Sequence, residues 1–146
     1  QVAERPAGIA LVEFGFDLDH LYVRIDGTRP MADLLRGGLS VTVRFLKPQG
    51  LRVIADMARG RFDGRLQTRA NGGAWSDTDP RGLVFAAGRV VEFGVPFTTL
   101  GLRVGDPVAF FVSLTKDATE LEQHPRHLPI ELEVPDRRFA ARNWTA

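Results

Sequence analysis

Cysteine is absent from this 146-residue chain, and lysine is nearly so, with Lys47 and Lys116 against seventeen arginines. The lack of cysteine excludes thiol catalysis, cysteine-rich zinc sites and disulfide bonds. The net charge is only +1 and the arginines are scattered along the sequence, so nucleic acid is not expected as a partner. No apolar run approaches the roughly 20 residues of a membrane span, so membrane insertion is not expected either.

The composition is that of one globular domain. Hydrophobic residues make up 44% and charged residues 25% of the chain, the mix of a soluble folded protein. This length is sufficient for a single core without disulfides or metals, so we expect one domain over residues 1–146. Because Gln1 is not an initiator methionine, we expect the domain to be a piece of a longer protein.

Period-two alternation of apolar and polar residues is the dominant pattern, and it is typical of β-strands. Together with short turns, it predicts an all-β fold, an antiparallel two-sheet β-sandwich with about nine or more strands. We expect the strands at residues 9–16, 21–26, 39–46, 51–57, 62–69, 83–86, 91–95, 108–115 and 130–134. The core between the sheets is expected to hold Val23, Val43, Phe93, Phe110, Val112 and Leu132. Residues 9–16 are apolar on both faces except at Glu13, which predicts a strand covered on both sides.

Two short segments have helical signals. Residues 30–36 have a proline at the start and a glycine pair after the end, and residues 96–100 are closed by Gly101. We expect one or two short helical turns there. Turn residues are found at Asp17–His20, Asp26-Gly27, Pro48–Gly50, Asp63-Gly64 and Asn71–Gly73.

The sequence offers little that is typical of an enzyme. It has no nucleophile elbow, zinc-protease motif, Walker loop or dinucleotide fingerprint. Glu131 and Glu133 lie on one face of a strand, roughly 6.6–7 Å apart, near the spacing of inverting glycosidases. Alternating glutamates on such a strand are more typical of a solvated face, so no catalytic residues are expected. We interpret His124 and His127 as loop histidines and not as metal ligands.

Trp75 is the strongest candidate for ligand binding. It stands in a polar loop, where an exposed flat side chain can stack on a sugar ring. The alternative is that the indole folds back over the sandwich edge. Polar neighbours that can bind sugar hydroxyls beside it are Arg69, Asn71, Asp77, Asp79 and Arg81. Trp144 is expected instead to pin the C-terminal segment to the core.

Arginines recur on the outward faces of the predicted strands, at Arg24, Arg44, Arg52, Arg65 and Arg69. Their planar donors can recognise hydroxyls or carboxylates. The interpretation we favour is cross-strand pairing with acidic residues, for which Asp26, Asp56, Asp63 and Glu92 are available.

The C-terminal half has a recognisable pattern. The run VVEFGVPFTTLGLRVGD over residues 90–106 is followed by an apolar strand at residues 108–114, and then by Ile130–Pro135 and Asn143-Trp144. This resembles the accessory β-sandwich at the C-terminus of some bacterial family 57 glycoside hydrolases. It also resembles the wider DOMON-like set, which includes family 9 carbohydrate-binding modules and the C-terminal module of glucodextranases. Asp19–Arg24 resembles the second strand of that set.

The resemblance implies a non-catalytic module that binds an oligo- or polysaccharide of the α-glucan type beside the catalytic domain of its parent chain. The parent would be a bacterial glycoside hydrolase, cytoplasmic or exported. The alternative is a structural sandwich that stabilises its parent without binding sugar. A structural calcium ion is also implied, with Asp17 and Asp19 as candidate ligands, although ordinary aspartate turn chemistry is the interpretation we favour. Some relatives bind haem through Met and His, but Met31 and Met57 have no characteristic spacing to the histidines.

Overall fold

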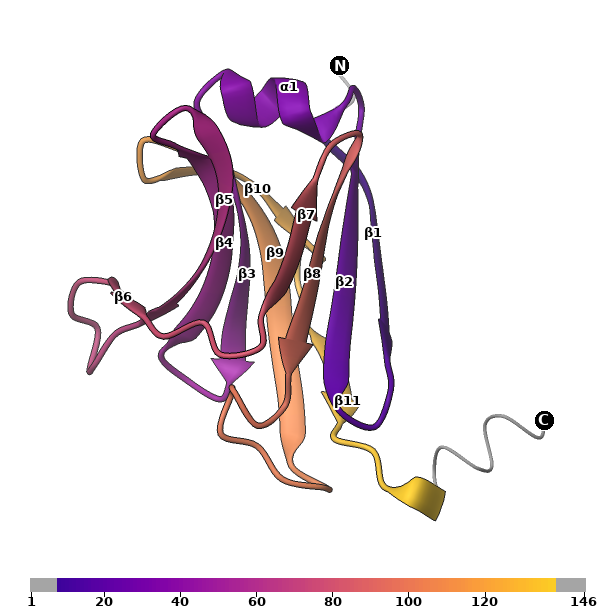
Figure 1. Cartoon of the computed structure of the whole chain (residues 1–146). Coiled ribbons are helices and arrows are strands. Elements are labelled where there is room, and N and C mark those ends of the chain that lie inside the picture. Colours follow the sequence, from indigo (N-terminus) through magenta and orange to yellow (C-terminus); the bar gives the residue numbers. More distant parts are fainter. Residues whose placement is uncertain (1–7, 139–146) are drawn as a thin grey trace.

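The computed structural model describes residues 8–138 and shows two antiparallel β-sheets packed face to face (Figure 1). The smaller sheet has the order β1-β2-β8-β7, and the larger has the order β10-β9-β3-β4-β5-β6, with β11 also paired to β9. The strands are β1 (Ile9–Phe16), β2 (His20–Gly27), β3 (Leu39–Lys47), β4 (Leu51–Ala58), β5 (Arg61–Thr68), β6 (Ser76–Thr78), β7 (Val84–Ala87), β8 (Val90–Pro96), β9 (Pro107–Lys116), β10 (Thr119–His124) and β11 (Ile130–Glu133). The predicted β-sandwich is confirmed.

All nine predicted strands are present, and two further strands were missed. β6 has only three residues, too few for alternation to be visible. β10 has the sequence TELEQH, and its Leu121 is exposed, so the strand is held by pairing with β9 and not by an apolar face. Alternation of apolar and polar residues is visible only where a strand buries one face, and β6 and β10 bury few side chains.

The core lies between the sheets. Of the six residues expected there, five are at most 1% exposed, namely Val23, Val43, Phe93, Phe110 and Val112, while Leu132 is partly buried against them. The Phe110 ring lies 6.0 Å from that of Phe45 and 6.1 Å from that of Phe14, between centroids. Burial of such a side chain stabilises the fold by about 1.5–3 kcal/mol.

The prediction that residues 9–16 are covered on both sides was wrong. β1 is the edge strand of the smaller sheet, and Leu11 and Phe14 are about half exposed. An apolar residue at an edge position satisfies the same sequence pattern as a buried one, because the pattern cannot show whether anything covers the strand.

The prediction of a turn at Asp63-Gly64 was also wrong, because both residues lie within β5. Gly64 pairs with Ala55 of β4, and the Phe85 ring of β7 packs on the space where a side chain would be. A glycine in a strand interior marks this kind of close approach. Here it brings the two sheets together at one open edge of the sandwich.

A short helix, α1 (Met31–Arg36), covers one end of the sandwich (Figure 1). Met31, Ala32, Leu34 and Leu35 are buried, and the helix ends at Gly37, before Gly38 with φ of 93°. Residues 97–101 form the single turn that was expected there, with the Thr99 and Leu100 N–H groups donating to the Pro96 carbonyl. Within residues 8–138 there is no helix long and apolar enough to cross a membrane.

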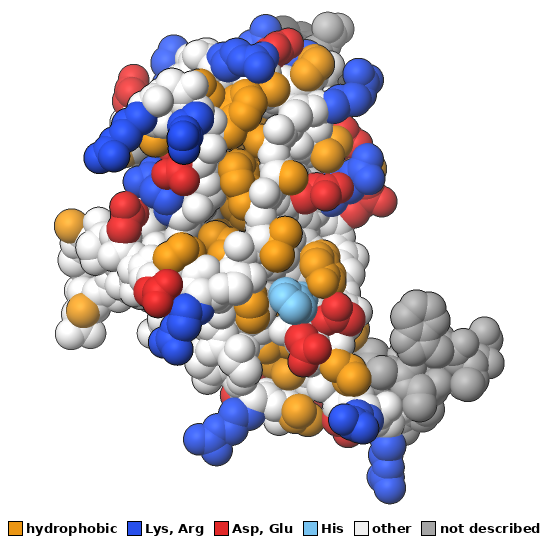
Figure 2. Space-filling model, in the orientation of Figure 1, with side chains coloured by type: hydrophobic (Ala, Val, Ile, Leu, Met, Phe, Trp, Pro, Cys, Tyr) orange, Lys and Arg blue, Asp and Glu red, His pale blue; other side chains and the backbone are white. Residues whose placement is uncertain are grey.

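The larger sheet is bowed, with the hollow side of β4 and β5 turned away from the smaller sheet (Figure 1). Figure 2 shows hydrophobic side chains in a band down the middle of the front face, over the gap between β5 and β7. The band marks the sandwich edge, whereas a row of polar side chains lies on the outer face of the larger sheet.

Candidate functional site

One row of side chains crosses the outer face of the larger sheet. Phe111 of β9 pairs with Arg44 of β3, Arg44 with Arg52 of β4, Arg52 with Gln67 of β5, and Gln67 with Asp77 of β6. Because directly paired residues point to the same face, these five side chains form a continuous row. Their neighbours on β9, β3 and β4, such as Phe110, Val43 and Val53, point the other way, into the core.

Hydrogen bonds connect one half of this row. Arg52 Nε donates to Gln67 Oε1 at 2.7 Å, and Gln67 Nε2 donates to Asp77 Oδ1 at 2.9 Å. Asp77 also lies 3.5 Å from Arg65 Nη1, and Arg65 Nη2 lies 2.6 Å from Asp56 Oδ2. The buried Gln67 amide therefore separates a cationic side of the face from a side where acidic residues surround Arg65.

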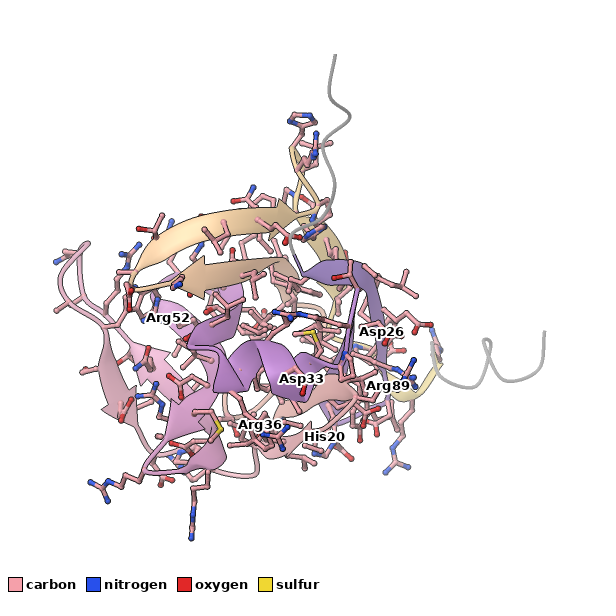
Figure 3. The ribbon with its side chains drawn as sticks, turned by 90° about the horizontal axis from the view of Figure 1, so that it is seen from above. His20, Asp26, Asp33, Arg36, Arg52 and Arg89 are labelled. Carbon is pink, nitrogen blue, oxygen red and sulfur yellow. The ribbon has the colours of Figure 1, made fainter. Side chains whose placement is uncertain are left out.

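Trp75 lies over the cationic side. Its half-buried indole has the Arg52 guanidinium carbon 4.3 Å from the ring centroid and that of Arg69 at 4.5 Å. Both distances are within the range of cation–π contacts. The tryptophan thus joins the loop after β5 to the outer face of the larger sheet. Seen from above, Arg52 lies on one side of α1, with Asp26 and Arg89 on the other (Figure 3).

A groove of about 660 Å³ opens beside Trp75. Its polar lining includes Arg44, Lys47, Gln49, Arg69 and Asn71, and no Asp, Glu or His is among the residues that line it. The groove thus combines one aromatic wall, amide groups and three cations. This combination can hold a hydroxylated or anionic ligand.

The structure brings some of the predicted sugar-binding residues together and leaves others apart. Arg69 and Asn71 line the groove with Trp75. Asp77 lines a different groove of about 580 Å³, together with Arg65 and Asp63. Asp79 and Arg81 are exposed, 3.7 Å apart, and line neither groove.

The favoured pairing of the outward arginines with acidic residues holds for two of the five. Arg24 lies near Glu13 and Glu92, and Arg65 near three aspartates. Arg44, Arg52 and Arg69 have no carboxylate within 4.0 Å in the described part of the chain, and each lies over an aromatic ring instead, Arg44 at 5.6 Å from that of Phe111.

Gln67 and Lys47 are site residues that the sequence analysis missed. The sequence signal for the position of Gln67 was Gly60, which lies between two predicted strands and favours a tight turn. In the structure Arg59 and Gly60 form a two-residue hairpin turn with positive φ at both residues. Such a turn fixes the β4–β5 register and so places Gln67 opposite Arg52.

Burial shifts two titratable groups on this face. Burial, with the nearby charges of Arg69 and Arg65, lowers the pKa of Arg52 below its usual range. Burial also raises the pKa of Asp56, and it outweighs the opposite effect of the Arg65 ion pair. Arg52 therefore lies where partial burial and neighbouring arginines make its positive charge unfavourable. Among the described residues, only Gln67 forms a hydrogen bond with it.

The two aspartates proposed as calcium ligands lie in the β1–β2 hairpin. Asp17 Oδ1 accepts from the Asp19 and His20 amides at 2.8 and 2.7 Å, and Asp17 Oδ2 accepts from the Tyr22 hydroxyl at 3.1 Å. This is aspartate turn chemistry, and it occupies both oxygens. Residues 8–138 contain no cluster of three or more His, Cys, Asp or Glu side chains arranged to hold a metal.

Replacing Asp17 by alanine is expected to lower the free energy of unfolding by about 1 kcal/mol at pH 7, because these hydrogen bonds are lost. Burial alone would raise the pKa of Asp17, but the amide and hydroxyl donors and His20 outweigh it and lower the pKa below 3.8. The carboxylate's contribution is therefore present above pH 3.8 and is lost as the pH falls through the lowered value.

Urea unfolding of the Asp17→Ala variant and the parent between pH 7 and pH 2 tests this, with Asp19→Ala as the control. The difference between parent and variant should shrink only below about pH 4. A difference that is constant over the whole range would contradict the role of the charge.

The remaining residues named in the sequence analysis are weaker candidates for a functional site. Glu131 and Glu133 are exposed, as expected for a solvated strand face. His124 Nε2 lies 2.9 Å from Glu122 Oε1, and His127 is exposed. Trp144 lies outside the described residues.

The sequence and the structure were compared with protein-family models, curated proteins and solved structures. None of them matches this chain. The resemblance to DOMON-like sandwiches and family 9 modules therefore stays a prediction.

Proposed function

We propose that this domain is a non-catalytic carbohydrate-binding module, appended to a glycoside hydrolase, and that the groove at Trp75 is its binding site. The observation that carries the proposal is the half-buried indole at the wall of a groove lined by Asn71, Gln49 and Arg69. Binding sites for sugars combine an apolar surface with a few fixed polar groups. The absence of acidic side chains from the groove's lining supports a non-catalytic role.

The two guanidiniums on the indole differ in how firmly they are held. Arg52 is fixed by its 2.7 Å hydrogen bond to Gln67, whereas the exposed Arg69 guanidinium lies on the ring and has no hydrogen-bonding or acidic partner within residues 8–138. A pyranose can therefore take the place of Arg69 on the indole, with the apolar C–H face of the sugar against the ring. Arg69 then becomes a donor to the sugar's hydroxyl oxygens.

A structural role is the second candidate, and a different face favours it. On the smaller sheet Leu11, Tyr22 and Val84 are 43–58% exposed. Exposed apolar side chains of this kind can pack against the catalytic domain of a parent chain. In that case the groove at Trp75 would bind no sugar.

Replacing Trp75 by alanine is expected to abolish binding of maltohexaose, the probe for the α-glucan class. With one aromatic wall, the parent's Kd should be on the order of 1 mM, or about −4 kcal/mol. The measurement is the change in tryptophan fluorescence in a Trp144→Phe background, where Trp75 is the only tryptophan, and the change in ¹⁵N amide shifts for the alanine variant.

Trp75→Phe is the matched control, because it keeps a smaller aromatic surface and should retain weak binding. Urea unfolding of each variant shows that the fold is intact. If Trp75→Ala bound sugar as well as the parent does, or if no saccharide moved the signals of the groove, the structural role would be the better interpretation.

A further inference from the structure

The groove at Trp75 is lined by cationic side chains that have no acidic partner within residues 8–138. Arg44, Lys47 and Arg69 line it, and Arg52 lies beside it on the indole. Within residues 8–138 none of these four cations has a carboxylate within 4.0 Å, whereas Arg65, on the same face, lies near three. This concentration stands out in a chain whose net charge is only +1.

The strand register forces some of these cations together. Arg44 and Arg52 are directly opposite each other in the β3–β4 pair, an arrangement that is unfavourable for like charges. Arg69 is on the same face of the larger sheet and shares the Trp75 ring with Arg52. A bound anion would remove this repulsion, and within the described structure no side chain does so.

Each of the three guanidiniums lies over an aromatic ring, and that of Arg52 is also fixed by a hydrogen bond. Phe111 supports Arg44, and Trp75 supports Arg52 and Arg69. Gln67 accepts a hydrogen bond from Arg52 Nε, which fixes Arg52 beside the groove, while Arg44 and Arg69 line the groove itself. A guanidinium presents parallel donors that match the two oxygens of a carboxylate.

We propose that the saccharide bound in this groove is acidic, a chain of uronic acid residues whose carboxylates pair with Arg44 and Arg69. The inference rests on the proposed function, since it takes the groove to be a sugar site and names the class of sugar. It replaces the neutral α-glucan that the family resemblance implies with a ligand whose charge complements the groove.

The test compares two hexasaccharides, hexagalacturonate and maltohexaose, by ¹⁵N amide titration and calorimetry. In about 20 mM salt the uronate should bind at least about tenfold more tightly, because charge-assisted hydrogen bonds are roughly twice as strong as neutral ones. At about 0.5 M salt the advantage should shrink severalfold, because the groove is open to solvent and screening weakens exposed pairs.

Arg44→Gln is the informative variant, since it removes one cation from the groove and keeps a hydrogen-bonding side chain. It should weaken hexagalacturonate binding about tenfold, as is typical for loss of a charged hydrogen bond, and weaken maltohexaose binding by a clearly smaller factor, because glutamine can still bind a neutral hydroxyl. Arg24→Gln is the matched control, because Arg24 is also an outward strand arginine but lies on the other sheet. It should leave both affinities unchanged.

The outcomes separate this inference from the function on which it rests. Tighter binding of the uronate that depends on Arg44 supports both. Equal or tighter binding of maltohexaose would overturn the inference and leave the sugar-binding function standing, whereas binding of neither sugar would overturn both. Uronate binding that Arg44→Gln does not weaken, or tighter binding of a thymidine oligonucleotide of equal charge, would also overturn the inference.

Discussion

Replacing Gly64 by valine is expected to lower the free energy of unfolding by about 3 kcal/mol, the upper part of the range for overpacking a core. A Cβ atom on Gly64 would lie 2.8 Å from Phe85 Cβ and closer still to the Phe85 ring. That ring cannot simply turn away, because it packs 5.6 Å from Phe93 between centroids, and Phe93 is buried. The larger side chain would therefore push the two sheets apart at this edge.

Gly15→Val is the matched control. Gly15 is also inside a strand, its φ is not in the left-handed region, and a Cβ there meets nothing within 4 Å. Because valine favours strands, this variant should be as stable as the parent or slightly more stable. Thermal and urea unfolding measure both changes, and Gly64→Val should lower Tm by about 10 °C. Equal stability of the two variants would contradict the close approach at Gly64.

Replacing Gln67 by leucine is expected to cost about 2 kcal/mol of stability, because two hydrogen bonds of a buried amide are lost. Arg52 Nε would lose its acceptor at 2.7 Å, and Asp77 Oδ1 would lose a donor at 2.9 Å. Arg52 would be affected most, since it is already partly buried beside Arg69. We also expect its guanidinium to leave the Trp75 ring, which would change the fluorescence of Trp75.

Gln123→Leu serves as the control, because Gln123 lies on the edge strand β10 of the same sheet and donates only to the exposed Arg126 carbonyl. Its cost should be within about 0.5 kcal/mol, as for most surface substitutions. Urea unfolding and fluorescence in the Trp144→Phe background give both readouts. If Gln67→Leu cost no more than Gln123→Leu, the amide would not organise this face.

The fold could be predicted from the sequence wherever a strand buries one face. Val23 and Val43 lie at alternating positions, and each is at most 1% exposed, because alternation directly reflects which face leaves water. The same reasoning failed at β1, where the pattern does not show that the strand is at an edge. It also failed at Gly64, because a glycine after an aspartate favours a turn locally, while the packing of Phe85 requires a glycine within the strand.

The candidate site could be predicted only in part. Trp75 was identified because a tryptophan in a polar loop is unusual, and Arg69 and Asn71 because they are near it in the sequence. Proximity in sequence also suggested Asp79 and Arg81, which line neither groove. Arg44 and Arg52 were noted only as outward arginines, because their place beside Trp75 depends on the registers of three strands, and alternation alone does not determine register.

The pairing of β3 with β9 has a consequence for how the chain folds. It brings residues 39–47 against residues 107–116 at the centre of the larger sheet. The hairpins β1–β2 and β4–β5 can form early from neighbouring residues, but this central pair must close a loop of about sixty residues. Proteins dominated by such distant contacts fold in milliseconds to seconds. During synthesis, β3 is therefore made well before β9, and until β9 is made one edge of β3 lacks its hydrogen-bonded neighbour in the larger sheet.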